Sequence, residues 1–197
     1  MTSSLVVSAH GPGQTFADAT TSRVVCVGKI RATTGAETDF QIPVRDAGTF
    51  KNLFTYAPTN TASVDSVITL RISLAASSLT VTYAADQTGI KEDTTNTPTV
   101  AATDEIVWAV VVPTEAGTNT LTLTLIACEF VPDTTTNCIS FLANTQNGNI
   151  TTASTTTFLP PLGGQGTGIT VEANVAIRMR GSFVSSNFYT NVTSNAR

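Results

Sequence analysis

Residues with catalytic or metal-binding chemistry are few in this sequence and widely spaced. The one histidine, His10, lies in a short glycine- and proline-rich stretch at residues 10–13. A catalytic histidine must be held rigidly beside its nucleophile, and a histidine-based metal site needs more than one such ligand. Neither condition is met around His10. We therefore predict that the protein is not an enzyme.

The carboxylates occur in small groups, and the most oxygen-rich stretch is residues 86–96. It contains Asp86, Glu92 and Asp93 among several Thr and Asn residues. Converging oxygens of this kind would suit Ca²⁺, but the stretch lacks the regular ligand spacing of a dedicated calcium loop. We interpret these residues as solvated turn residues and predict that the protein has no cofactor.

Binding to phosphate, nucleic acid or membranes is also disfavoured. The glycines at positions 163, 164, 166 and 168 are followed by no P-loop lysine and no helix, so they do not form a phosphate cradle. The formal net charge is −4, and Lys and Arg form no cluster. Phosphate contacts require concentrated positive charge. We expect no direct nucleic-acid binding and no membrane partner.

The three cysteines, Cys26, Cys128 and Cys138, are an odd number and show no CxxC spacing. The simplest interpretation is that they are buried or half-buried free thiols in a protein assembled under reducing conditions.

Composition indicates an all-β protein. Only 12% of the residues are charged, against an ordinary share of about 25%. The chain is instead crowded with Thr, Ser, Asn, Ala and Val, of which Thr and Val favour strands. The clearest alternation runs over residues 66–74, and residues 106–112 are apolar on both faces, with Trp108 predicted in the core. Further strands are expected at 23–31, 38–44, 49–57, 79–84, 99–102 and 118–130.

About eight short antiparallel strands of this kind fit a jelly roll or a related β-sandwich, here placed at residues 23–130. Residues 1–22 are small and polar, and we predict an arm with little structure of its own. A Pro/Thr linker at residues 131–136 leads to a partial second β unit at residues 137–197, which repeats the motif of residues 37–60.

The repeated motif begins with a glutamate and continues through an alternating run to an arginine, a glycine, a phenylalanine and an asparagine. Small insertions and deletions fall beside the glycine, as expected of a pair of strands with a variable corner. We predict a structural role for the arginine, which would satisfy loop carbonyls or pair with the motif's glutamate. The motif residues are Glu37, Arg45, Gly48, Phe50 and Asn52 in the first repeat, and Glu172, Arg180, Gly181, Phe183 and Asn187 in the second.

The second repeat lacks the strands that follow the motif in the first, and an isolated half-sandwich exposes an apolar face and open strand edges. Three alternatives follow. The missing strands come from another copy or another protein, or the half unit docks on the first unit, or this chain is part of a longer polypeptide.

Together with the residues leading to Arg71, Gly89, Asn96 and Asp104, the motif resembles phage virion structural proteins built from tandem jelly-roll units of the tumour-necrosis-factor-like type. The resemblance implies a virion component that forms homo-oligomers, often trimers, assembled in the host cytoplasm. Such proteins serve as capsid decoration or cement proteins, fibres and tail modules.

We expect a non-enzymatic decoration or cement protein that stabilises the shell through self-association and exchange of its arms, with the major capsid protein or another virion protein as its partner. The alternative is a receptor- or glycan-binding module of a fibre or tail. It predicts exposed aromatic residues in the loops, and the stretches 85–98 and 144–157 contain no Trp or Tyr and no Phe.

Overall fold

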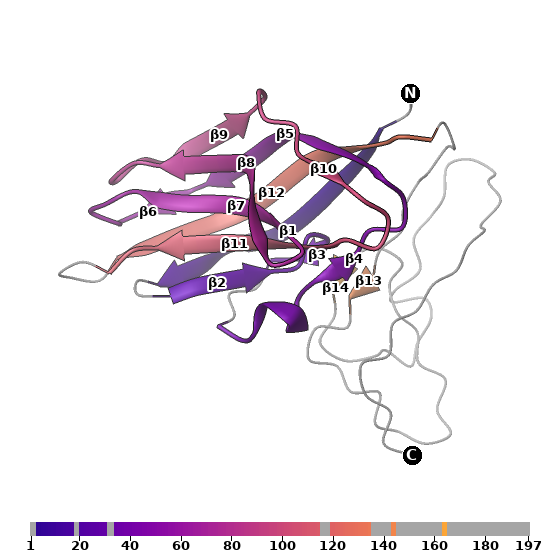
Figure 1. Cartoon of the computed structure of the whole chain (residues 1–197). Coiled ribbons are helices and arrows are strands. Elements are labelled where there is room, and N and C mark those ends of the chain that lie inside the picture. Colours follow the sequence, from indigo (N-terminus) through magenta and orange to yellow (C-terminus); the bar gives the residue numbers. More distant parts are fainter. Residues whose placement is uncertain are drawn as a thin grey trace, which may run out of the picture.

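The computed structural model describes residues 3–17, 20–30, 34–114 and 119–134, together with two short strands at 143–144 and 163–164. In this part of the chain two β-sheets pack face to face as a sandwich (Figure 1). Pairing within both sheets is antiparallel, apart from a short parallel contact between β1 and β3. The predicted all-β sandwich class is confirmed.

The first sheet, called sheet A below, has β12 at its centre, with β1 on one side and β5 on the other. Its strands are β10 (Thr99–Val100), β5 (Gly48–Ala57), β12 (Thr120–Pro132), β1 (Ser4–Ala17) and β3 (Gly28–Lys29), with β9 (Gly89–Asp93) beside β5 and β6 (Thr59–Asn60) beside β12. Sheet B contains β2 (Thr20–Val24), β11 (Glu105–Val112), β7 (Ser66–Ile72) and β8 (Ala75–Tyr83), with β4 (Ile42–Pro43) beside β11.

The order of pairing is nested. Strand β1 pairs with β12, β2 with β11, β5 with β9, and β7 with β8, so the chain resembles one long hairpin rolled across two sheets. This nesting is the connectivity of a jelly roll. It brings strands that are distant in sequence side by side, and it places β8 and β9 at neighbouring edges of the two sheets.

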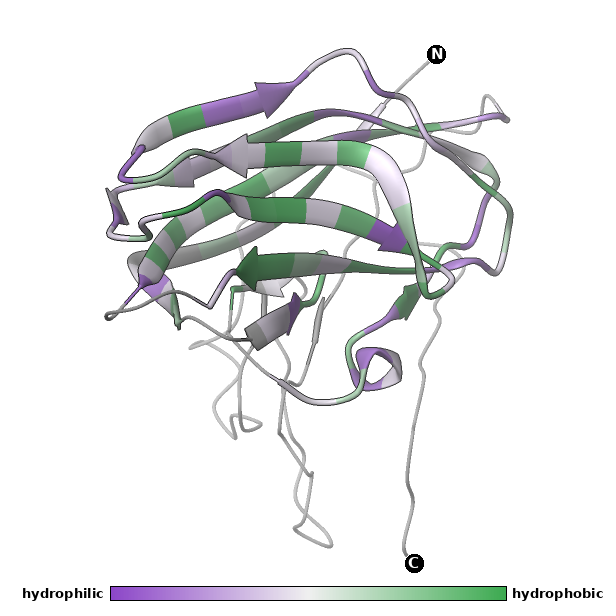
Figure 2. Ribbon diagram, turned by 60° about the vertical axis from the view of Figure 1, so that its left-hand side comes forward, coloured by the Kyte–Doolittle hydropathy of each residue, from purple (hydrophilic) through white to green (hydrophobic). Residues whose placement is uncertain are grey.

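The core lies between the sheets, where alternate residues of each strand point inward. Trp108 of β11 is fully buried, as predicted, and Tyr83, Phe16 and Phe50 are the other large aromatic members. Strand β11 is apolar along most of its length, whereas β7 and β8 alternate (Figure 2). Both faces of β11 are buried over Ile106 to Val110, so a second layer must cover its outer side.

The expectation of an arm with little structure at residues 1–22 is wrong for Ser4–Ala17. This segment is strand β1, paired with β12 along nearly its whole length. The register shifts between Ala9 and Gln14, so a bulge absorbs the glycine- and proline-rich stretch that suggested an unstructured arm. The open edge of β12 supplies backbone partners that local sequence does not reveal.

Two predicted strands are shorter than expected. The run at 23–31 divides into the end of β2 and the two-residue β3, because the chain crosses from sheet B to sheet A between them. The run at 38–44 contains a 3₁₀-helix at Glu37–Asp39 and pairs only at Ile42–Pro43. Conversely, the predicted loop at 86–96 includes strand β9, which pairs with the edge of β5.

Strand β12 extends to Pro132, so the predicted linker at 131–136 begins within a strand. Beyond Thr134 the structure describes only β13 (Ala143–Asn144) and β14 (Gly163–Gly164), which pair in parallel. The other residues of the predicted second unit, 137–197, lie outside the described residues. This includes every motif residue of the second repeat, so the duplication stays a prediction.

Substitution of Gly48 tests how closely β5 approaches β12. An added Cβ would lie 2.4 Å from the carbonyl oxygen of Val131 and 2.8 Å from the ring of Phe130. We expect Gly48→Ala to lower the free energy of unfolding by about 2–3 kcal/mol through overpacking. Gly89→Ala is the control, because its Cβ would meet nothing within 4 Å and only its positive φ causes strain, which costs about 1 kcal/mol. Urea denaturation measures both, and an equal loss would contradict the proposed clash.

Candidate interaction surface

The first repeat of the motif joins β5 to β12. Phe50 is buried and its ring lies 4.9 Å from that of Phe130, centroid to centroid. Asn52 has φ +53° and its side-chain amide donates a 2.7 Å hydrogen bond to Glu129. The register between the two strands shifts at this point. Gly48, Phe50 and Asn52 therefore belong to one seam, and their contacts are structural.

Glu37 binds two arginines from different strands. Its carboxylate accepts hydrogen bonds from Nε of Arg71 at 2.8 and 2.7 Å, and it lies 3.0 Å from Nη2 of Arg23. Arg23 and Arg71 lie on β2 and β7, the two neighbours of β11, opposite Ala109 and Val107 respectively. The carboxylate thus spans the outer side of β11, which explains how Val107 is fully buried on that face.

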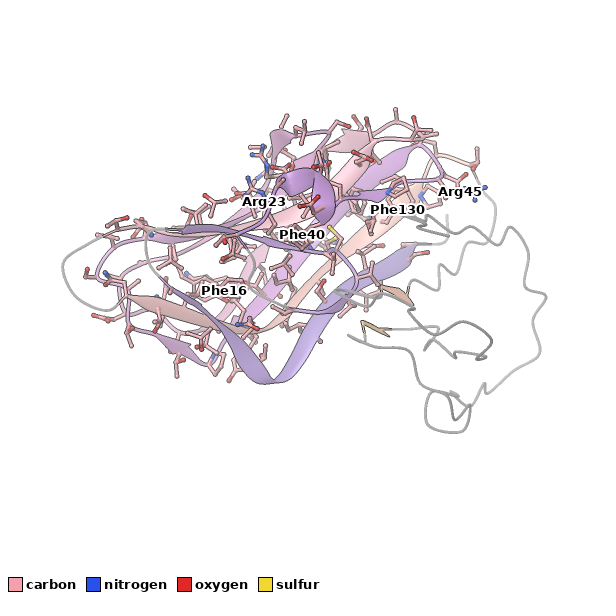
Figure 3. All side chains as sticks on the ribbon, turned by 90° about the horizontal axis from the view of Figure 1, so that it is seen from below. Phe16, Arg23, Phe40, Arg45 and Phe130 are labelled. Atoms are coloured by element: carbon pink, nitrogen blue, oxygen red, sulfur yellow. The ribbon has the colours of Figure 1, made fainter. Side chains whose placement is uncertain are left out.

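Arg45 lies apart from this ion-pair cluster. Figure 3 shows it on the corner before β5, near the Phe130 end of the sandwich, whereas Arg23 lies beside the 3₁₀-helix at the other side of the view. The ion pairs of Glu37 are with Arg23 and Arg71, and the structural role predicted for Arg45 stays a prediction. Glu37 is drawn to Arg23 and Arg71 because the 3₁₀-helix folds back over sheet B.

The ion-pair cluster predicts a measurable loss on neutralising Glu37. The side chain of Glu37 is 9% exposed and those of Arg23 and Arg71 are 17% and 22% exposed, so Glu37→Gln leaves two arginines with little solvent. We expect unfolding to require about 2 kcal/mol less. Lys51→Met is the control, because its 3.7 Å ion pair with Glu129 is more open to water and is worth about 0–1 kcal/mol. Denaturant titration measures the free energy of unfolding of both variants. An equal loss in the two would contradict a special role of the ion-pair cluster.

Asp93, the last residue of β9 at the edge of sheet A, is a hydrogen-bond hub whose carboxylate reaches the edge of sheet B. It accepts bonds from the backbone nitrogens of Thr80, Thr95 and Asn96 and from the side chains of Thr95 and Asn96. Its 7% exposure corrects the interpretation as a solvated turn residue for Asp93, whereas Asp86 and Glu92 are exposed as predicted. Because the Thr80 nitrogen belongs to β8, the carboxylate blocks part of an otherwise open strand edge.

Burial alone would raise the pKa of Asp93, but the hydrogen bonds from Asn96, Thr80 and Thr95 stabilise its ionised form and lower the pKa from 3.8 to about 2. A shallow groove of about 350 Å³ lies beside this carboxylate. Its lining is polar and contains no aromatic ring: Thr80, Val81, Thr82, Lys91, Glu92, Asp93, Thr94, Thr95 and Asn96.

Asp93 should contribute to the acid sensitivity of the fold. Its folded pKa lies below its unfolded value, so the stabilisation is fully present above pH 3.8 and is lost as pH falls towards 2. We expect Asp93→Asn to remove about 1–2 kcal/mol at neutral pH, allowing for solvent screening, and to flatten the decline between pH 4 and 2. Unfolding curves across that range test this. An unchanged pH slope in Asp93→Asn, beside the surface control Asp86→Asn, would contradict it.

The outward side of sheet A carries contiguous apolar side chains. The strand register places Ile90, Tyr56, Leu125 and Ala9 in one row across β9, β5, β12 and β1. The next row contains Glu92, Phe54, Ala127 and Val7, and Lys51, Glu129 and Leu5 follow. None of the apolar members belongs to the core cluster between the sheets, although Ala127 is only 7% exposed. We call this surface the apolar face: Leu5, Val7, Ala9, Phe54, Tyr56, Ile90, Leu125 and Ala127.

Exposure is uneven across the apolar face. Leu5 is 73% exposed, Ile90 57% and Tyr56 41%, and these are three of the five large apolar residues that are exposed in the described part of the chain. The outward side of sheet B differs, because Thr69, Thr80 and Thr82 occupy much of it and the Glu37 cluster covers another part, while Val111 is 36% exposed. Among the described residues, sheet A therefore carries the broader apolar outer surface.

The described cysteines are inert. Cys26 and Cys128 are free and buried, as predicted, while Cys138 lies outside the described residues. Burial, and secondarily the proximity of Cys128, raises the pKa of Cys26, and burial raises the pKa of Cys128 to about 12. Neither thiol forms the nucleophilic thiolate at neutral pH.

Among the residues that the structure describes, no three His, Cys, Asp or Glu side chains converge as a metal site. No helix in the same residues is long and apolar enough to cross a membrane. Fold and surface together define a jelly-roll sandwich with one apolar outer face. No protein-family model matches the chain, and no curated protein is detectably similar to it.

Proposed function

We propose that this protein is a non-enzymatic structural component of a phage particle, a decoration or cement protein that stabilises the capsid shell. The observation that carries the proposal is the apolar face. Contiguous apolar side chains on the outer side of a sheet are often functional and are a common feature of sites of protein association. A protein whose main surface feature is of this kind is suited to assembly.

Composition supports the same proposal. The chain has few charges and many hydroxyl groups, and burying a neutral hydroxyl surface against a neighbour costs less than burying ionic groups. In a symmetric shell each contact is repeated many times, so weak contacts add up to strong attachment. Binding to the assembled state then resists dissociation by mass action.

The motif resembles tandem jelly-roll units of phage proteins. This resemblance is the reason for proposing a phage particle as the location and the major capsid protein or another virion protein as a partner. Self-association, often as a trimer, and exchange of chain segments between neighbours belong to the same proposal. The protein would thus reside in the virion after assembly in the host cytoplasm.

A receptor- or glycan-binding module of a fibre or tail is the second candidate. The polar groove beside Asp93 favours it, because hydroxyl, amide and charged groups there converge between β8 and β9. The groove offers no aromatic ring for a sugar to stack on, so its lining gives this candidate less support than the apolar face gives the first.

Copy number per particle tests the proposal. Purified particles are digested, and the chain is quantified by mass spectrometry against isotope-labelled peptides and against the major capsid protein. A decoration protein is expected at hundreds of copies, and particles that lack it should release their genome at a lower temperature, with recovery on adding the purified protein. A few copies per particle would favour the fibre or tail module. Complete absence from particles would overturn the virion proposal.

A further inference from the structure

We propose that a second copy of this chain occupies the apolar face, so that the outer side of sheet A is the interface between protomers. This inference deepens the proposed function and rests on it for the expectation of self-association. It starts from the strand register, which puts Tyr56 directly between Ile90 and Leu125 across three adjacent strands. The three side chains form a continuous ridge, of which Ile90 and Tyr56 are exposed and Leu125 is half-buried in the described part of the chain.

The size and composition of the face match the middle of a protein interface. Eight apolar positions, on strands about 4.8 Å apart and in rows about 7 Å apart, give a patch of roughly 270 Å². A standard interface needs about 800 Å² from each partner, with an apolar centre and a polar rim. The rest of this side of sheet A supplies that rim, because threonines continue the rows towards the start of β12: Thr15, Thr59, Thr122 and Thr124.

Charge favours a second copy over an ionic partner. The centre of the face has no charged side chain, and its margin carries both signs, with Lys51 and Glu129 on one side and Glu92 on another. A strongly basic or acidic partner would find no complementary field there. The apolar face of a second copy carries the same positive and negative side chains at its margin and the same apolar centre. Two such faces can therefore pair without net charge repulsion.

The positions of the two most exposed apolar residues, Leu5 and Ile90, fit a twofold pairing of the face. Ile90 lies on β9 in the first row and Leu5 lies on β1 in the last row, so they stand at opposite corners of the apolar face. In a symmetric pair of sheets, a twofold axis along the other diagonal would bring Leu5 of one protomer to Ile90 of the other, twice. Each exposed corner residue of one protomer would then be buried against the opposite corner residue of the other protomer.

Substitutions on the apolar face test the inference in the full-length protein. Ile90→Glu and the milder Tyr56→Ser alter outward side chains and leave the core untouched. Leu74→Glu is the matched control, because Leu74 is 54% exposed but lies in the turn between β7 and β8, away from the face. Molar mass is measured by light scattering after gel filtration and the dissociation constant by sedimentation, with circular dichroism to confirm folding.

We expect the unaltered chain to exceed its monomer mass of 20.5 kDa and Leu74→Glu to behave like it. Ile90→Glu should run as a monomer, and Tyr56→Ser should weaken association about tenfold or more. A monomeric unaltered chain, or unchanged association in both face variants, would overturn the inference. Failure of the proposed function is separate: a chain that associates through this face but is missing from particles supports the interface and removes the virion role.

Discussion

Strand β12 is the constraint on which the rest of the structure depends. It pairs with β1 along one side and with β5 and β6 along the other, so both ends of the described chain and its middle meet on one strand. Its inward residues Leu121, Leu123 and Ile126 are fully buried. Because β12 has partners on both sides, its backbone donors and acceptors are used within the sheet, and only its outward side chains remain available for contacts with other molecules.

The outer sides of the two sheets differ, so the two faces of the sandwich present different chemistry to a partner. On sheet B, the 3₁₀-helix brings Glu37 across β11 to Arg23 and Arg71, and this closes over side chains that would otherwise be exposed. On sheet A, no described segment plays that role over Tyr56 and Ile90. A partner would find an ionic and hydroxyl-rich surface on one side and an apolar surface on the other, and desolvation of the apolar side chains would favour contact through the second.

The local sequence pattern predicted most of the strands, but it did not predict the first strand, β1, or the edge strand β9. The strict alternation of residues 66–74 and the doubly apolar run at 106–112 both became central strands, because each pattern needs a sheet on one or both faces. Ser4–Ala17 and Gly89–Asp93 were missed because glycines, prolines and charges dominate their local composition. They are strands because β12 and β5 present unpaired edges beside them. Asp93 was likewise missed, since its partners come from another strand and from the next turn.

The sequence alone determined the fold class of this protein, because strand-forming residues recur at a period of two and charged residues are few. It also predicted buried or half-buried free thiols, and Cys26 and Cys128 are buried. Only the tertiary structure decided which outward side chains become neighbours, because a row such as Ile90, Tyr56 and Leu125 exists through strand register. Register between distant strands depends on the whole set of backbone pairings and on the packing of both sheets, and neither is written in a local stretch of sequence.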